Sequence, residues 1–188
     1  MKKNITKENA ERRKKRRKQT AEIFTPPELV NEMLNKLPDE VWKNEKTFCD
    51  PACGNGNFLI YVLWRKLSLG YDSVESLKTI YGVDIKRDNI RECRLRLLKV
   101  ISLSESMTKD HIRTVFRNIA FLNQKKYPKG SLQYDFSFSN SPDERSVDER
   151  YNKINNGELD LVDLPVLEEE FDAPLDMFAQ EDESEDRT

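Results

Sequence analysis

Apolar runs and amphipathic stretches alternate along the middle of the chain. Short, mainly apolar runs predict strands at 46–49, 80–85, 112–116 and 134–139. The helical segments expected between them span 58–69, 72–79 and 87–103. In the last of these, apolar residues recur at the spacing of one helical face, at Ile90, Cys93, Leu97 and Val100. Strands that alternate with helices form parallel sheets, so we expect an α/β fold.

A further amphipathic helix is expected ahead of the first strand. Thr25 has a side-chain oxygen suited to an N-cap, and Pro26 and Pro27 suit a first helical turn. Apolar residues then recur at helical spacing from Leu29 onward. We therefore expect Thr25 to cap a helix that ends before Pro38.

Charge is strongly segregated along the chain, although the formal net charge is only −2. Residues 1–18 hold ten Lys/Arg and two acids, whereas residues 143–188 hold four Lys/Arg and seventeen acids. Blocks of like charge resist packing and serve as interaction tails. We therefore expect a disordered basic arm at 1–19, one folded domain at 20–142 and a largely disordered acidic tail at 143–188. The arm suits a solubilising role, contact with nucleic-acid phosphates or a localisation signal.

The cysteine and histidine content argues against several kinds of site. Cys49, Cys53 and Cys93 lack the spacing of a metal site, and the single histidine, His111, predicts no catalytic triad. Free thiols suit a reducing compartment. No apolar run has the length of a membrane span or the layout of a secretory signal. We therefore expect a cytoplasmic protein without a metal.

The clearest candidate chemistry lies around two acids. A strand ends at Asp50, glycines follow at Gly54 and Gly56, and an apolar helix has begun by Phe58. Glycine lets the backbone pass close to a ligand, and a helix N-terminus offers unpaired N–H groups to an anion. The next expected strand ends near Asp84, where a carboxylate can hold ribose hydroxyls. This layout predicts a site for a nucleotide-like cofactor.

Four segments resemble the adenine-N6 DNA methyltransferases. Residues 50–59 are similar to the S-adenosylmethionine loop of that family, and residues 22–30 to the Phe-Thr-Pro element that precedes it. Residues 81–85 resemble its ribose-binding strand, and residues 134–142 its catalytic strand and loop. The likeness covers residues 19–142 and implies a Rossmann-like S-adenosylmethionine methyltransferase core.

The resemblance implies S-adenosyl-L-methionine as cofactor and DNA as partner. In the family, the loop and its acid hold the methionine end, the acid of the next strand holds the ribose, and the Phe-Thr-Pro segment closes over the methionine moiety. The cofactor-binding residues implied are Phe24, Thr25, Pro26, Asp50, Ala52, Cys53, Gly54, Gly56, Asn57, Phe58, Asp84 and Ile85.

The catalytic residues implied are Asn140, Ser141 and Pro142, where the family pattern is Asp/Asn/Ser-Pro-Pro-aromatic. In the family, a side-chain oxygen and the next backbone carbonyl accept the two N6 hydrogens of adenine, an arrangement related to an oxyanion hole. Asn140 and the carbonyl of Ser141 can supply these acceptors. However, Ser141 replaces the first proline, and Asp143 replaces the aromatic residue on which a flipped base stacks.

Only four strands are expected here, whereas the family sheet has seven. The implied order is 3-2-1-4, so we expect a core truncated after the fourth strand, with an edge that the tail, a partner chain or a second copy must cover. Residues 173–178 also resemble short peptides that dock on DNA sliding clamps, with Leu175, Met177 and Phe178 as the apolar anchors. Alternatively, the same three side chains would fold back and cover the open edge of the truncated sheet.

The function expected first is transfer of a methyl group from S-adenosylmethionine to adenine N6 in DNA, by a compact enzyme of the kind expected in a phage or mobile element. The alternative is an inactive protein that binds S-adenosylmethionine and acts as a DNA- or clamp-associated adaptor. A third interpretation is methylation of an RNA or of a protein amide.

Overall fold

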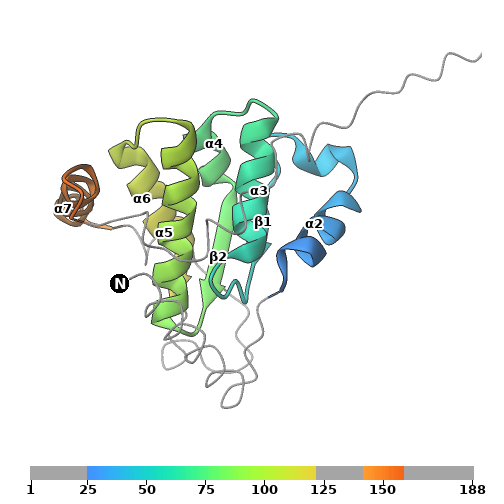
Figure 1. The fold of residues 1–188 in the computed structure, drawn as a ribbon, viewed down its shortest axis with the longest axis horizontal. Helices are drawn as coiled ribbons and strands as arrows, with labels where there is room; N and C mark the ends of the chain where they lie inside the picture. Colours follow the sequence, from blue (N-terminus) through green and yellow to red (C-terminus); the bar gives the residue numbers. More distant parts are fainter. Residues whose placement is uncertain (1–24, 122–141, 159–188) are drawn as a thin grey trace, which may run out of the picture.

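The computed structural model describes residues 25–121 and 142–158. A small parallel sheet runs through the described part of the chain, with helices packed around it (Figure 1). Its strands are β1 (Phe48–Asp50), β2 (Ile80–Asp84) and β3 (Ile119–Phe121), in the order β1-β2-β3. Both pairings are parallel, so the fold is mixed α/β, as the alternation of elements predicts.

The helices of the described residues connect and cover these strands. They are α2 (Pro27–Asn35), the 3-10 helix η1 (Asp39–Trp42), α3 (Asn57–Ser68), α4 (Ser73–Lys78), α5 (Arg87–Ser104), α6 (Lys109–Asn118) and α7 (Glu144–Asn155). The helices predicted at 58–69, 72–79 and 87–103 are confirmed as α3, α4 and α5. None of the helices described has the length and apolar character needed to cross a bilayer.

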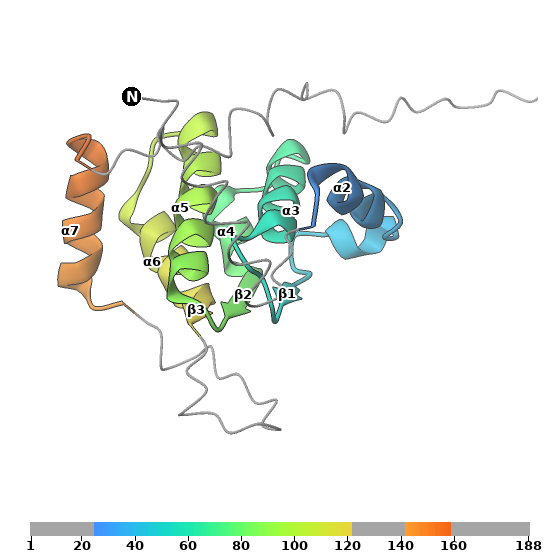
Figure 2. The same cartoon turned by 60° about the horizontal axis from the view of Figure 1, so that its bottom comes forward.

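The core lies where α3 and α5 meet each other and the sheet (Figures 1 and 2). The residues buried from α3 include Leu59, Ile60 and Leu63, and those from α5 include Leu97 and Val100. Both helices are crossover connections between neighbouring parallel strands, so their apolar faces turn toward the same layer. This packing holds the carboxyl ends of β1 and β2 at one edge of the domain.

The strand predicted at 112–116 is wrong, because these residues lie within α6. Ile112 and Val115 are buried at helical spacing, although the β-branched side chains of the segment suggested a strand. The backbone N–H of Thr108 donates to His111 Nδ1 over 2.9 Å and closes the first turn of the helix. The third strand is instead Ile119–Phe121, and the strand predicted at 134–139 lies outside the described residues.

The predicted N-cap at Thr25 is also wrong. Helix α2 begins one residue later than that cap requires, with Pro26 in the cap position and no side-chain cap bond. The two successive prolines explain this, since their fixed φ angles and missing N–H groups start a helix without a side-chain cap. The Thr25 carbonyl accepts a hydrogen bond elsewhere in the fold, from Asn57.

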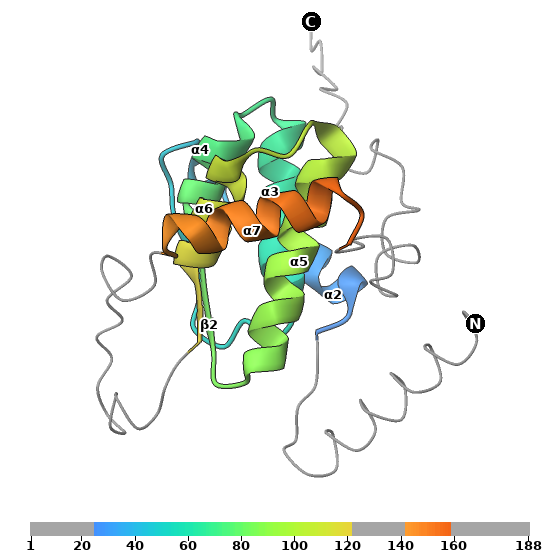
Figure 3. The same ribbon diagram turned by 90° about the vertical axis from the view of Figure 1, so that its left-hand side faces the viewer.

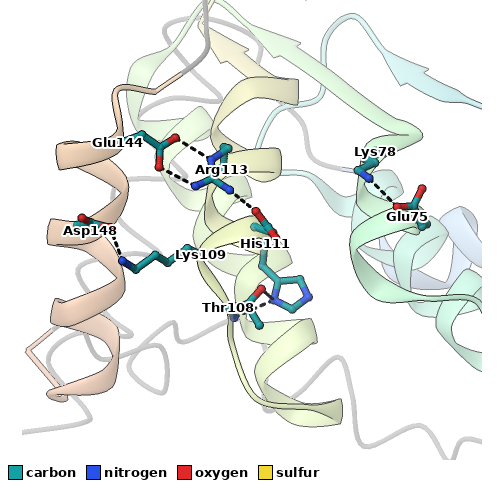
Figure 4. A network of polar contacts seen from close by, with 9 residues as sticks. Glu75, Lys78, Thr108, Lys109, His111, Arg113, Glu144 and Asp148 are labelled. Atoms are coloured by element: carbon teal, nitrogen blue, oxygen red, sulfur yellow. Dashed lines mark hydrogen bonds and ion pairs between the residues drawn. The ribbon is translucent and has the colours of Figure 1, made fainter.

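Helix α7 lies in the segment predicted to be a largely disordered acidic tail. Its apolar residues Val147, Tyr151 and Ile154 are spaced by four and three residues and form one helical face, with Val147 fully buried. Charged residues of α7 also pair with α6, as Figure 4 shows: Arg113 makes a two-pronged contact with Glu144, at 2.8 and 2.6 Å, and Lys109 lies 2.7 Å from Asp148. The tail prediction therefore fails for residues 144–155, while residues 159–188 lie outside the description.

A buried lysine joins the start of β1 to the rest of the sheet. Lys66 on α3 has no exposed surface, and its ammonium donates three hydrogen bonds of 2.7–3.1 Å. The acceptors are the carbonyls of Asn44 and Lys46, just before β1, and the hydroxyl of Thr79, just before β2. Burial lowers the pKa of Lys66, but three acceptors use all three of its donors.

Candidate functional site

Two carboxylates end neighbouring parallel strands at the same edge of the sheet. Asp50 closes β1 and pairs in register with Gly82, two residues before Asp84 closes β2. Both side chains are half-buried. Burial raises the pKa of the Asp50 carboxyl, and repulsion from Asp84 adds to this effect. The edge thus gathers hydrogen-bond acceptors and negative charge.

The loop after β1 is tied back to the ends of both strands. The N–H of Ala52 donates to Asp50 Oδ1 over 3.0 Å, and the N–H of Cys53 donates to the Val83 carbonyl over 2.9 Å. The N–H of Gly54 donates to Asp84 Oδ2 over 3.1 Å. The loop that the sequence singled out therefore lies against β2, and Asp84 joins the two strand ends.

Two glycines give this loop its path. Gly54 has a φ of 54° and Gly56 a φ of 93°, in the left-handed region where other residues are strained. Gly56 occupies the N-cap position of α3, and a Cβ built on it would lie 2.5 Å from Cys93 Sγ of α5. Only glycine fits there, so the tight turn brings α3 and α5 close together.

Asp84 is the centre of a second set of contacts. Its Oδ1 accepts from the N–H of Lys86 over 2.7 Å and from Asn89 Nδ2 over 3.3 Å. Together with the bond from Gly54, these contacts fix the carboxylate between the loops that follow β1 and β2. Ile85, the next residue, is 51% exposed and lies at the rim of the same edge.

Asn57 connects the glycine loop to the segment before α2. Its Nδ2 donates to the Thr25 carbonyl over 2.7 Å, and its Oδ1 accepts from Arg96 over 2.6 Å. The same guanidinium nitrogen of Arg96 also donates to the Asn55 carbonyl over 3.0 Å. The side chain of Asn57, predicted to bind cofactor, therefore links two parts of the predicted site to each other.

Sequence patterns missed the buried Arg96. This residue has no exposed surface, although it is charged. It lies three residues after Cys93 and four before Val100, which places it on the buried face of the predicted helix. A charged residue at such a position is a signal that could have identified it. Glu92, one turn earlier, accepts from Asn55 Nδ2 over 3.1 Å and supports the same loop.

The thiols near the loop are structural. Cys53 and Cys93 are buried and free, and contact with Cys93 together with burial raises the pKa of Cys53. A raised pKa keeps the thiol neutral, and a neutral thiol is a poor nucleophile and metal ligand. Within the described ranges, no group of three or more His, Cys, Asp or Glu side chains could hold a metal ion.

The predicted catalytic loop falls mostly outside the described residues. Phe24, Asn140 and Ser141 are not described, whereas Pro142 is half-buried just before α7. Asp143, which stands where the family resemblance calls for an aromatic residue, accepts from the N–H of Ser146 over 3.0 Å and caps α7. A helix-capping role explains an acid at that position.

Of the other predicted cofactor-binding residues, the structure brings most to the edge formed by Asp50 and Asp84. Cys53 and Gly54 lie against β2, while Gly56 and Asn57 begin α3. Ala52 is exposed, and Phe58 is half-buried in the first turn of α3. Thr25 and Pro26 are connected to this group through Asn57.

The chain is similar to known proteins over most of its length. The family model of the N-6 DNA methylases matches residues 5–154. The type II methyltransferase M.VspI of Vibrio sp. (strain 343) is 31% identical over 120 residues, an alignment that covers 64% of this chain and 24% of the relative. The chain thus spans about a quarter of the length of that curated relative. No solved structure matches the chain significantly. Because the family model matches most of its length, the chain belongs to the N-6 DNA methylase family.

Proposed function

We propose that the edge formed by Asp50, Asp84 and the glycine loop binds S-adenosylmethionine. One observation carries the proposal: two half-buried carboxylates end adjacent parallel strands, and the loop between them is held to Asp84. Ligands of α/β sheets bind at the carboxyl ends of the strands. Membership of the N-6 DNA methylase family supports the same choice of cofactor.

The residues present fit this cofactor chemically. The amino group and ribose hydroxyls of S-adenosylmethionine are donors, and Asp50 and Asp84 are acceptors with lone pairs to spare. The N-terminus of α3, which begins at Asn57, suits the cofactor carboxylate. The glycines at 54 and 56 keep side chains out of the turn. We assign Thr25 and Pro26, together with Phe24, to the segment beside the methionine moiety.

We further propose that the substrate is adenine in DNA. The cofactor, when bound, supplies an electrophilic methyl group. The side-chain oxygen of Asn140 would accept a hydrogen bond from one N6–H, and the Ser141 carbonyl would accept a hydrogen bond from the other. The nitrogen lone pair would then be directed toward the methyl group. Pro142 would stiffen the backbone after these acceptors.

We infer that β1, β2 and β3 are the first strands of a Rossmann-like sheet. The order β1-β2-β3 and parallel pairing support this, because the remaining family strands would pair on the side of β1 where no strand of the described residues pairs. A partner chain or further strands would cover that side. The clamp-docking segment with Leu175, Met177 and Phe178 stays a prediction, since it lies outside the described residues.

The direct test uses the whole chain, unmethylated duplex DNA and S-adenosylmethionine labelled on its methyl group. We expect calorimetry to detect cofactor binding and scintillation counting to detect label in DNA, at adenine N6 after digestion to nucleosides. Asn140→Ala should abolish transfer and leave cofactor binding unchanged. If the wild type does not bind cofactor at millimolar concentration, the proposal is wrong.

A second candidate, a cofactor-binding adaptor without catalytic activity, is favoured by one observation. Asp143 replaces the stacking aromatic residue and caps α7 instead. If the wild type binds cofactor without transferring methyl groups and a Ser141→Pro/Asp143→Tyr variant transfers them, the adaptor is the correct interpretation. The variant should retain α7, because loss of an N-cap costs only about 1 kcal/mol.

A further inference from the structure

A groove of about 380 Å³ lies on the β3 side of the domain. Residues of α5, of the end of α6, of β3 and of α7 line it, and Figure 3 shows α7 crossing over α5 and α6 on this side. Its charged lining consists of five basic side chains and one acid: Arg87, Arg91, Arg94, Arg150, Lys153 and Glu149.

The positive charge of this groove has few counter-charges. The carboxylate of Glu149 lies 3.3 Å from Arg145, which is 89% exposed and outside the lining. The negative charge of Glu149 is therefore already paired with Arg145. Among the described residues, no carboxylate forms an ion pair with any of the five basic side chains. A concave surface with one sign of charge raises the local concentration of ligands of opposite charge.

Aromatic rings hold three of the guanidinium groups in place. Arg94 and Arg150 lie over the same ring, each with its central carbon 4.4 Å from the centroid of Phe116. Arg87 lies 4.2 Å over Phe121 in the same way. Stacking of this kind fixes the planes of the guanidinium groups before a ligand arrives.

Two of these arginines also donate hydrogen bonds to backbone carbonyls. Arg94 donates to the carbonyls of Phe116 and Ile119, and burial lowers its pKa to about 10, with repulsion from Arg150 adding to the shift. Arg150 donates to the Ser146 carbonyl over 2.8 Å. Two fixed cations that contact the same ring repel each other, and a bound anion would relieve that repulsion.

The remaining basic residues are exposed and lie along the groove. Arg87 and Arg91 lie one turn apart on α5, roughly 6 Å along the helix axis, and Lys153 faces the groove from α7. One strand of duplex DNA carries a phosphate about every 3.4 Å of its axis. The groove also begins at the sheet edge of the proposed cofactor site, since Phe121 pairs in register with Asp84.

We propose that this groove binds the phosphodiester backbone of DNA, with Arg87, Arg91 and Lys153 contacting phosphates and Arg94 and Arg150 shaping the surface. The groove lies outside the methyl-transfer site, and its assignment rests on the proposed function only in taking DNA as the ligand. Binding there is independent of sequence, because phosphates carry no base information.

The test compares the salt dependence of DNA binding in full-length variants. A 20-base-pair duplex with a fluorescent label is titrated by anisotropy between 50 and 200 mM salt. Arg91→Gln/Lys153→Gln should weaken binding about tenfold and reduce the slope of log affinity against log salt by about 1.8, or 0.9 for each phosphate that is no longer neutralised. The matched control, Lys36→Gln/Lys78→Gln, removes the same charge from exposed positions just after α2 and at the end of α4. It should leave the slope unchanged.

Several outcomes would overturn the proposal. An unchanged slope in Arg91→Gln/Lys153→Gln, equally weakened binding in both double variants, or no DNA binding by the wild type would each do so. Failure of the charge-retaining Arg91→Lys/Lys153→Arg variant to restore binding would exclude a charge interaction. Tighter binding of polyglutamate than of DNA, abolished in the Gln variant, would assign the groove to an acidic peptide instead.

Cofactor binding, measured in parallel, separates this proposal from the proposed function. If the wild type binds no S-adenosylmethionine while the groove variants change the salt slope, the methyltransferase proposal fails and the groove assignment stands. If the wild type methylates DNA while the groove variants leave the salt slope unchanged, the groove assignment fails and the methyltransferase proposal stands. Unchanged circular dichroism spectra confirm that each variant is folded.

Discussion

Arg96 donates a 2.6 Å hydrogen bond to Asn57 Oδ1 in the interior of the protein, across 39 residues of sequence. Neither residue lies on a strand, yet the bond connects the middle of α5 to the first turn of α3. Because Asn57 in turn holds the Thr25 carbonyl, the guanidinium determines where two parts of the candidate cofactor site lie relative to each other.

Arg96→Met should therefore destabilise the protein by about 2–3 kcal/mol. The Asn55 carbonyl and Asn57 Oδ1 would lose a donor, and each buried acceptor left unpaired costs ~1–3 kcal/mol, offset in part by removal of a buried charge. Urea denaturation measures the change. Arg91→Met, at an exposed position of the same helix, should change stability by less than about 0.5 kcal/mol. Equal effects of the two variants would show that the buried bonds add nothing.

Gly56→Ala should destabilise the protein more than Gly70→Ala. Both glycines have positive φ angles, of 93° and 80°, so both changes incur a strain of roughly 1–2 kcal/mol. Only Gly56 has a neighbour in the way, since its added Cβ would meet Cys93 Sγ, whereas nothing lies within 4 Å at Gly70. Thermal melting should show the difference. Cys93→Ala in the Gly56→Ala background should recover part of the stability; no recovery would mean that the clash with Cys93 is not the cause.

Stability should fall as the pH drops below about 6.5, the usual pKa of histidine. Burial lowers the pKa of His111, against opposing effects of nearby carboxylates, so the unfolded chain binds a proton more readily than the folded one. The destabilisation therefore begins near the unfolded pKa and levels off below the lowered folded pKa. Urea midpoints between pH 8 and 5 measure it.

His111→Gln is the control for this pH effect. A glutamine at the third helical position can still accept from the N–H of Thr108 but does not titrate. The difference in stability between the wild type and this variant should shrink toward low pH. Burial also raises the pKa of Asp50, but that carboxyl titrates in both proteins and cancels from the difference. A difference that is constant with pH would contradict the assignment to His111.

Asp84→Ala should weaken S-adenosylmethionine binding by at least about tenfold, since hydrogen bonds to a charged group contribute ~1.5–3 kcal/mol each. Asp84→Asn, which keeps one carbonyl oxygen, should have a smaller effect. Isothermal calorimetry measures both, and the exposed Asp39→Ala on η1 serves as the control for removal of a carboxylate. Wild-type affinity in Asp84→Ala would remove this residue from the cofactor site.

Local pattern was enough to predict the parts of the fold and site that depend on neighbours in sequence. Helices α3 and α5 have clear apolar spacing, and the acid and glycines of 50–56 lie within one turn. The role of Arg96 could not be predicted in this way, because its partners lie some forty residues earlier and only packing of α5 on α3 brings them together.

The errors have equally local causes. The β-branched residues of 112–116 suggested a strand, and the N-terminal turn closed by His111 outweighs that preference. In α7, the spacing of Val147, Tyr151 and Ile154 was hidden among charged residues, and local spacing does not reveal that this face packs against α6.

The three bonds of Lys66 have a consequence for strand alignment. Strand β1 has only three residues, so its own ladder resists sliding weakly. A shift of one residue would turn every side chain to the opposite face and remove the Asp50 carboxylate from its edge. The ammonium finds all three acceptors only in the present alignment, because two precede β1 and the third precedes β2. The position of an acid at one end of the sheet is thus determined by a lysine near its other end.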